Sequence, residues 1–332
     1  MNNSQVYDVD RKIVSILKVL DNAEHPLGSR IIARNLNGLG IELSERAVRY
    51  HLRFMDERGL TTLAGRRDGR LITEQGQTEL KRALVTDKVG MAFAKIEALA
   101  FQMTFDWKNR TGSLPVNVSL FQKDQFPRAL KKMRPVFKSG LCVSELITVA
   151  EEGEYIGDMR VPEGKIALGT VCSVSINGAF LKAGIPVDSR FGGILQIQNR
   201  QPLRFTELIH YSGSSLDPSE IYIRAGMTSV SEAVMTGNGE ILANFREFPA
   251  VCRSLAETVF KELKDAGIGG VCKMGNISET VFEIGIEQHR VGLILFGGMN
   301  PIAAAQESGI PTENYAMSML TDYQTLINID EL

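Results

Sequence analysis

Apolar residues recur at helical spacing along the N-terminal part of the chain. The spacing of Val9, Ile13, Ile16, Leu17 and Leu20 predicts a helix from about Asp8 to Leu20. A second helix is expected from Ser29 to about Leu36, because glycines interrupt residues 37–40. Ser44 then provides the N-cap of a third helix, and Gly59 ends it.

The third helix, within LSERAVRYHLRFMDERGL (residues 43–60), has two chemically different faces. At about 100° per residue, Val48, Leu52 and Met55 share one face. The opposite face carries Arg46, Arg49, Tyr50 and Arg53. Such a face is either solvated or bound to something negatively charged, and the helix alone does not separate the two.

The segment after this helix favours binding to nucleic acid. Residues 61–73 predict two short strands around a basic turn, and a fourth helix follows from about Glu74. Three helices followed by a basic hairpin is the order of a winged helix-turn-helix, whose recognition helix fits the major groove of DNA. The predicted DNA-binding residues are Ser44, Arg46, Arg49, Tyr50 and Arg53 near and on the helix, and Arg66, Arg67 and Arg70 on the wing.

The pattern changes after this N-terminal domain, which we place at residues 1–84. Residues 85–114 are expected to form a helical connector, whose apolar residues pack into the next domain or form a helix–helix seam. Residues 115–332 predict a mixed α/β domain. Strands are expected at 116–121, 144–150, 192–198, 221–226 and 291–298, and helices at 124–137 and 252–267. The predicted fold class is α+β.

The α/β domain contains a weak internal duplication. Residues 153–160 (GEYIGDMR) resemble 239–246 (GEILANFR), and 193–202 (GILQIQNRQP) resemble 292–301 (GLILFGGMNP). Two VSE segments and two VC pairs keep the same order. We therefore expect two copies, at about 115–219 and 220–332, around a pseudo-twofold axis. A cleft between two such copies is a common place for a small ligand.

Matched positions of the two copies supply candidate ligand residues. Cys172 and Cys272 each follow a valine, and each is expected to be either a small buried residue or a thiol that lines a pocket. A second set of matched turn residues comprises Asn199 and Arg200 in the first copy and Gly297, Gly298 and Asn300 in the second. Such turns either hold an anion on their backbone N–H groups or only end a strand.

Charge is unevenly distributed, although the formal net charge is only −2. Residues 1–82 contain 14 Lys+Arg and 11 Asp+Glu, whereas the rest of the chain contains 23 and 28. The basic excess of the first domain favours an anionic partner.

Other features of the sequence argue against several classes of protein. Four scattered cysteines and four histidines lack ligand spacing, so we expect no metal site and no disulfide framework. Phosphate-binding and nucleophile motifs are absent, so we expect no catalytic site and no cofactor. Without a signal-like or membrane-length apolar run, the protein is expected to be cytoplasmic and not membrane-bound.

The chain resembles the NrpR-type transcriptional repressors of archaea and some bacteria. The resemblance lies in SERAVRYHLRFMDERGL, GGILQIQNRQP and GGMNPIAAAQESGI, and it extends over nearly the whole chain. It implies a nitrogen-responsive repressor that binds a palindromic operator as a homodimer and is released by 2-oxoglutarate. Some members carry two regulatory domains in tandem, whereas this chain has one.

A dicarboxylate effector suits a pair of arginines, because each guanidinium binds a carboxylate through two hydrogen bonds. Arg160 and Arg246 end the matched octapeptides, so they are the predicted pair. The alternative is that each arginine only pairs with a nearby acid such as Glu154 or Glu240.

Two other functions remain open from the sequence. One is an enzyme that acts on a small molecule and carries a winged-helix appendage. The other is an RNA-binding or protein-docking regulator, because some winged domains bind RNA or protein. A comparison of binding to duplex DNA and to RNA tests the RNA-binding alternative. An assay for turnover of bound metabolites tests the enzyme alternative.

Overall fold

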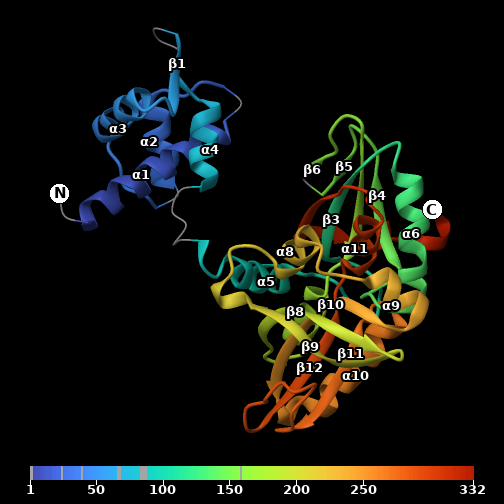
Figure 1. The fold of residues 1–332 in the computed structure, drawn as a ribbon. Helices are drawn as coiled ribbons and strands as arrows, with labels where there is room; N and C mark the ends of the chain where they lie inside the picture. The colour runs from blue at the N-terminus through green and yellow to red at the C-terminus, as the bar shows by residue number, and fades with distance from the viewer. Residues whose placement is uncertain (1–2, 24, 39, 66–68, 83–87, 158) are drawn as a thin grey trace. The chain divides into compact units, whose positions relative to one another are not determined.

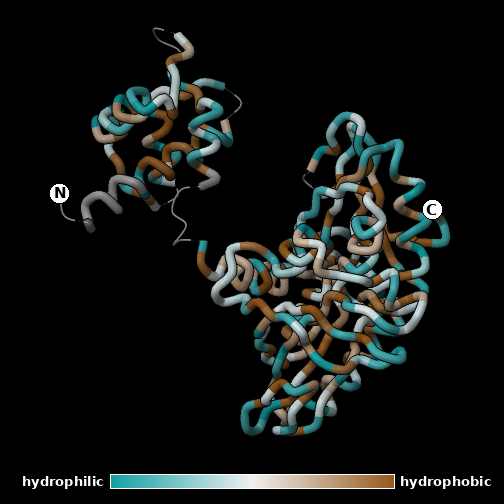
Figure 2. The backbone as a smooth tube through the Cα atoms, in the orientation of Figure 1, coloured by the Kyte–Doolittle hydropathy of each residue, from teal (hydrophilic) through white to brown (hydrophobic). Residues whose placement is uncertain are grey.

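A computed structural model describes residues 3–23, 25–38, 40–65, 69–82, 88–157 and 159–332. The chain divides into two compact units, Met1–Lys88 and Val89–Leu332 (Figure 1). The helix expected in the connector, α5 (Met91–Gln102), belongs to the second unit. In Figure 2, hydrophobic residues gather along the strands of this unit.

The first unit is the predicted winged helix-turn-helix. It contains α1 (Asn3–Asp21), α2 (Ser29–Gly38), α3 (Glu45–Glu57), the hairpin β1 (Thr61–Gly65) and β2 (Gly69–Ile72), and α4 (Glu74–Arg82). The predicted apolar face of α3, with Val48, Leu52 and Met55, is fully buried against α1 and α2. Burial of this stripe holds the opposite face of α3 toward solvent.

The second unit contains two five-stranded antiparallel sheets, which with the winged helix confirm the α+β fold class. One sheet has the order β13 (Glu313–Asp322), β3 (Ser113–Gln122), β7 (Lys165–Val171), β4 (Leu146–Ala150), β14 (Ile327–Asn328). The other has the order β11 (Val271–Ile277), β12 (Arg290–Phe296), β10 (Gly239–Pro249), β8 (Asp188–Gln198), β9 (Gln201–His210). A small separate hairpin joins β5 (Tyr155–Ile156) and β6 (Met159–Arg160).

Helices pack in two groups against the sheets. In the first, α6 (Phe126–Ser139), α9 (Val230–Thr236) and α11 (Asn300–Glu307) contact one another. In the second, α7 (Val174–Lys182) contacts both α5 and α10 (Arg253–Asp265). The short 3-10 helix η2 (Tyr211–Gly213) lies against α5, and α8 (Pro218–Ala225) lies against β8.

The two copies of the duplication exchange a strand. Elements β3, α6, β4, β7, α7 and β8 recur in the same order as β10, α10, β11, β12, α11 and β13. However, β8 of the first copy pairs with β10 of the second, and β13 of the second pairs with β3 of the first. Each sheet therefore contains strands from both copies.

Hydrogen bonds at equivalent positions support this correspondence. Cys172 N donates to Pro115 O at 2.9 Å, and Gly297 N donates to Leu242 O at 2.8 Å. Ser175 Oγ lies 3.4 Å from Pro115 O, and Asn300 Nδ2 lies 3.0 Å from Leu242 O. The same strand-to-helix turn is therefore built twice.

The sequence predicted the duplication but aligned the copies in the wrong register. The first match supplies β5 (Tyr155–Ile156) and β6 (Met159–Arg160), whereas 239–246 lie on the central strand β10. Likewise, 193–202 lie on β8 and its turn, while 292–301 lie on β12 and the start of α11. Cys172 follows β7, but Cys272 lies within β11, so these cysteines are not equivalent. Short apolar strands resemble one another by composition, so octapeptide matches do not fix the register.

The strand predicted at 221–226 is also wrong, because these residues lie in α8 and its C-cap. Asp217 accepts a hydrogen bond from Ser219 N at 2.8 Å, and Pro218 occupies the first turn. These are strong helix-start signals. A short apolar run alone does not distinguish a strand from a buried helix.

Replacing Asn300 tests the turn of the second copy. Its Oδ1 accepts from Leu242 N at 2.8 Å, and its Nδ2 donates to Leu141 O at 2.7 Å. Asn300→Ala leaves these buried backbone groups unsatisfied, so we expect a loss of about 2–4 kcal/mol in the free energy of unfolding. Urea unfolding measures it.

The equivalent variant Ser175→Ala is the control. It removes one long contact, so its cost should stay below about 1 kcal/mol. Equal losses in the two variants would contradict the different roles given to the two turns.

Candidate functional site

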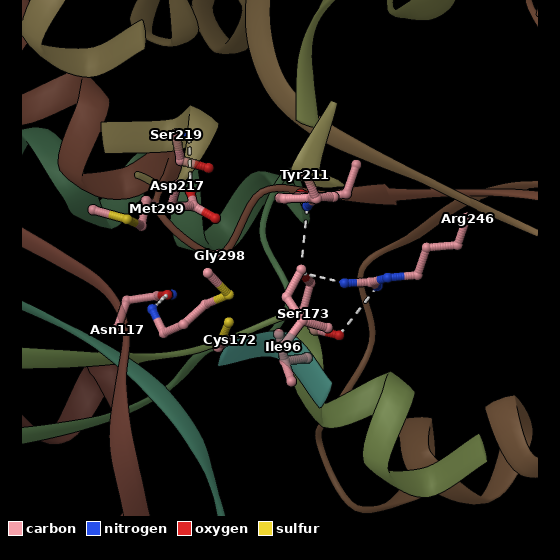
Figure 3. Close-up of a pocket in the computed structure, with 13 residues that line it drawn as sticks. Ile96, Asn117, Cys172, Ser173, Tyr211, Asp217, Ser219, Arg246, Gly298 and Met299 are labelled. Carbon is pink, nitrogen blue, oxygen red and sulfur yellow. Dashed lines mark hydrogen bonds between the residues drawn. The ribbon is translucent and has the colours of Figure 1, made fainter. Parts of the chain in front are cut away.

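The two strand-to-helix turns meet around a small polar chamber. Cys172, Ser173 and Val174 line it from the first copy, and Gly298 and Met299 line it from the second (Figure 3). The turns touch closely, because a Cβ added to Gly298 would lie 2.4 Å from Val171 O. Only glycine allows this approach, which places the N-terminal ends of α7 and α11 at the same cavity.

Arg246 is the most unusual residue of this chamber. It lies on the central strand β10 and is fully buried. Its guanidinium donates to Ser173 O at 3.2 Å, to Ser173 Oγ at 3.1 Å and to Ser189 Oγ at 3.3 Å. Among the described residues, no carboxylate forms an ion pair with it. Burial lowers the pKa of this guanidinium, because the charge has lost its water.

Two buried asparagines at equivalent positions face the chamber. Asn117 Oδ1 accepts from Met317 N at 3.0 Å, while its Nδ2 donates to Thr170 Oγ1 at 3.3 Å. Asn244 Nδ2 donates to Ser173 Oγ at 3.3 Å, and its Oδ1 accepts from the Tyr211 hydroxyl. Both asparagines lie between apolar neighbours, Val116 and Val118 on β3 and Ala243 and Phe245 on β10.

Asp217 is the acidic member of the chamber. Burial raises the pKa of its carboxyl, and the Ser219 backbone and hydroxyl groups, Lys95 and Arg246 act in the opposite direction. Burial also raises the pKa of the Tyr211 hydroxyl well above its ordinary value. A guanidinium, a carboxyl and a phenol thus share one enclosed space, and perturbed groups in a cavity are characteristic of functional sites.

The chamber is small. Its cavity volume is about 10 Å³, roughly the space that one water occupies. Ile96 of α5 forms part of the wall, and Met317 of β13 forms another part. An organic ligand therefore fits only after elements of this wall move.

The structure brings together only some of the predicted effector residues. Arg246, Cys172 and Gly298 line the chamber. Gly297 and Asn300 lie next to it but bond to Leu242 of β10. Cys272, Asn199 and Arg200 do not line it; Asn199 and Arg200 form the β8–β9 turn at φ of 50° and 63°. Burial raises the thiol pKa of Cys172 to about 11 and of Cys272 to about 12, so neither thiol is activated.

The predicted pairing of Arg160 with Arg246 is wrong. Arg160 is exposed on the β5–β6 hairpin, and its Nε lies 3.5 Å from Gly153 O. Arg246 lies buried on a different sheet. The sequence also missed Asn117, Asn244, Tyr211 and Asp217. The detectable signal was an asparagine in the middle of the apolar segments VNVSLF and ILANF.

The winged-helix unit presents the predicted basic face of α3. Ser44 caps this helix, with its Oγ accepting from Ala47 N at 3.2 Å. Arg46 and Arg53 are exposed, and Tyr50 is 71% exposed. Arg49 pairs with Glu45 at 2.7 Å and Arg53 with Glu57 at 3.4 Å, both one turn apart on the helix surface.

The wing is fixed to the recognition helix by an ion pair. Arg70 Nε donates to Asp56 Oδ2 at 2.8 Å, and its NH2 group lies at the same distance from that oxygen. Arg70 is therefore mainly engaged within the protein. Arg66 and Arg67 lie outside the described residues.

None of the helices in the described parts of the chain is both long and apolar enough to cross a membrane. The His, Cys, Asp and Glu side chains of the same parts form no group of three that could hold a metal ion.

Comparisons with known proteins agree with this architecture. A family model described as NrpR regulatory domains NRD1 and 2 matches residues 89–328. A model described as the Ribonuclease R winged-helix domain matches residues 14–80. The crystal structure of a nitrogen repressor-like protein from Methanococcus jannaschii aligns with a TM-score of 0.61 and 28% identity, over 72% of this chain and 98% of that one.

Curated relatives are named as regulators. Global nitrogen regulator NrpRI of Methanosarcina mazei is 39% identical over 97% of this chain and 98% of its own length. Global nitrogen regulator NrpR of Methanococcus maripaludis is 30% identical over 94% of this chain, which spans 54% of that protein. These matches confirm the resemblance given by the sequence and indicate a regulatory, non-enzymatic family. The chain belongs to the NrpR family of nitrogen regulators.

Proposed function

We propose that this protein is a nitrogen-responsive transcriptional repressor, which binds palindromic operator DNA as a homodimer and releases it when 2-oxoglutarate binds. The observation that carries DNA binding is the exposed row of Arg46, Arg49, Tyr50 and Arg53 on α3, opposite a fully buried apolar face. Arginine reads guanine O6 and N7 by paired hydrogen bonds in the major groove.

The ion pairs of Arg49 and Arg53 do not oppose this role. Both arginines are well exposed, at 65% and 83% of their side chains. Exposed pairs of this kind contribute about 0–1 kcal/mol. Breaking them therefore costs little when the arginines turn toward a base or a phosphate.

We propose a homodimer because the DNA-binding surface of one winged helix is small. One winged helix provides few base contacts, which is too little discrimination for a genome. Two copies related by a twofold axis read two half-sites about one helical turn apart.

The chamber around Arg246 is the proposed effector site. A buried guanidinium with neutral partners is costly, and an incoming carboxylate supplies the missing charge. The first backbone N–H groups of α7 and α11 add favourable partial positive charge at the same cavity. Asn117 and Asn244 offer further polar groups to a second carboxylate or a keto oxygen.

The small volume of the chamber supports a regulatory role. A five-carbon dicarboxylate does not fit the present cavity, so its binding must favour a wider conformation. Ile96 of the wall belongs to α5, the first helix after the winged-helix unit. Displacing α5 is therefore a direct way to connect the chamber with the DNA-binding unit.

Arg49→Ala should weaken operator binding by about 1–3 kcal/mol and relax discrimination at one base position. Arg204→Ala, which removes an exposed arginine from β9, is the matched control and should bind like the wild type. Gel-shift titrations with operator, base-substituted duplex and RNA of the same sequence measure both effects. Wild-type affinity of the Arg49 variant, or preference for the RNA, would contradict the proposed contact.

Arg246→Met should fold, bind operator and fail to respond to 2-oxoglutarate. Because the variant removes a buried charge that forms no ion pair among the described residues, its melting temperature should equal or exceed that of the wild type. Calorimetric titration should show effector affinity lowered about 30- to 150-fold, the equivalent of about 2–3 kcal/mol.

Two variants control the effector experiment. Arg160→Met removes an exposed arginine outside the chamber and should leave effector affinity unchanged. Arg246→Lys keeps the charge without the planar fork and should give an intermediate loss. Unchanged affinity in Arg246→Met, or an equal loss in Arg160→Met, would overturn the assigned chamber.

A further inference from the structure

The helix α5 is apolar on nearly all sides. Its sequence, MAFAKIEALAFQ, contains only two charged residues, Lys95 and Glu97. One face is buried in the second unit against α7 and η2, through Ala92, Ile96, Leu99 and Ala100. A helix that is hydrophobic all round is normally buried all round. The opposite face of α5 nevertheless lies in solvent.

This exposed face carries a regular apolar seam. The seam consists of Met91, Ala94, Ala98 and Phe101, which follow the three–four–three spacing of coiled-coil core positions. Met91 is 50% exposed and Phe101 is 80% exposed. The two alanines between two large residues allow another helix to approach closely at the middle.

We propose that the seam of α5 packs against the same seam of a second copy of this chain. The proposal rests on the homodimer of the proposed function and names the surface that forms it. A twofold interface uses one patch on both subunits, so the patch must complement itself. The α5 seam complements itself, because the alanines of one subunit face the alanines of the other and the large residues of the two subunits pack beside each other.

Charge beside the seam selects a parallel pair. In an antiparallel pair, Glu97 would face Glu97 of the partner subunit, whereas the Lys95 ammonium is turned inward and donates to Ala316 O. In a parallel pair, Glu97 lies toward Gln102 of the partner subunit and no like charges meet. A parallel pair also brings both chain segments that lead to the winged-helix units to the same end, as a palindromic operator requires.

The contact extends beyond α5 itself. A stable interface buries about 1,200–2,000 Å² in total, more than four side chains supply. The elements that border α5 carry further exposed apolar residues: Leu181 on α7, Leu216 after η2 and Tyr315 on β13. These residues add exposed apolar area on or near elements that contact α5.

Phe101→Glu tests the seam by placing a charge on each side of the interface. Sedimentation of the full chain should give two-chain particles for the wild type, with 36.6 kDa per chain. The variant should raise the dimer dissociation constant at least ~100-fold. Val251→Glu, at a 91% exposed apolar position next to α10, is the matched control and should stay dimeric.

Disulfide formation tests the orientation and remains informative if Phe101→Glu does not fold. Ala94→Cys alone should form a cross-linked dimer under mild oxidation, because equivalent positions face each other in a parallel pair. The wild type, with buried Cys142 and Cys172 and partly buried Cys252 and Cys272, gives the background. Cross-linking only in a mixture of Ala94→Cys and Ala98→Cys would overturn the parallel arrangement.

The outcomes separate this inference from the proposed function. If Phe101→Glu stays dimeric and Ala94→Cys does not cross-link, the seam is not the dimer interface, and the homodimer of the proposed function still stands. A monomeric wild type would overturn both. If the wild type is monomeric and the Phe101→Glu variant sediments more slowly than the wild type, another part of the same chain covers the seam.

Discussion

The exchange of β8 and β13 between the two copies is the constraint on which the second unit depends. Each of these strands pairs with the first strand of the other copy, β10 or β3, so neither sheet forms from one copy alone. Register is strict in such sheets, because a slip of one residue moves every buried side chain to the wrong face. The exchange therefore fixes the two copies against each other and holds the turns before α7 and α11 in contact at Gly298.

That contact explains why the chamber tolerates groups that a protein interior normally rejects. Burying Arg246 without a carboxylate costs free energy, and the large apolar cores of the two sheets offset this cost. The neutral oxygens of Ser173 and Ser189 hold the guanidinium without neutralising it. The chamber therefore holds a buried guanidinium that has no ion-paired carboxylate among the described residues, in a cavity of about 10 Å³.

The sequence predicted the features that depend on neighbouring residues and missed those that depend on contacts between distant segments. The faces of α3, its Ser44 cap and the order of the winged helix follow from spacing alone, and the structure confirms them. Strand exchange depends on pairing between distant segments, so no local pattern reveals it. Arg246 was predicted from a false match with Arg160, and it lines the chamber for a different reason, its place on β10. Tyr211 reaches the chamber from η2, and Asp217 reaches it as the N-cap of α8; the helix-start signal of Asp217 and Pro218 indicates a cap but not a place in a cavity.

The two faces of α5 are apolar for different reasons. Its inner face must be apolar to cover the chamber wall, where Ile96 lies beside Cys172 and Val174. Lys95 lies at the edge of that face and donates to Ala316 O at 3.1 Å, close to the chamber strand β13. The proposed widening of the chamber would displace α5 or the segment from η2 to α8, because the other walls belong to sheets and turns that the strand exchange fixes. A movement of α5 affects the rest of the assembly only if the outer face of α5 contacts another surface. The apolar seam on that face is the surface that we propose for this contact.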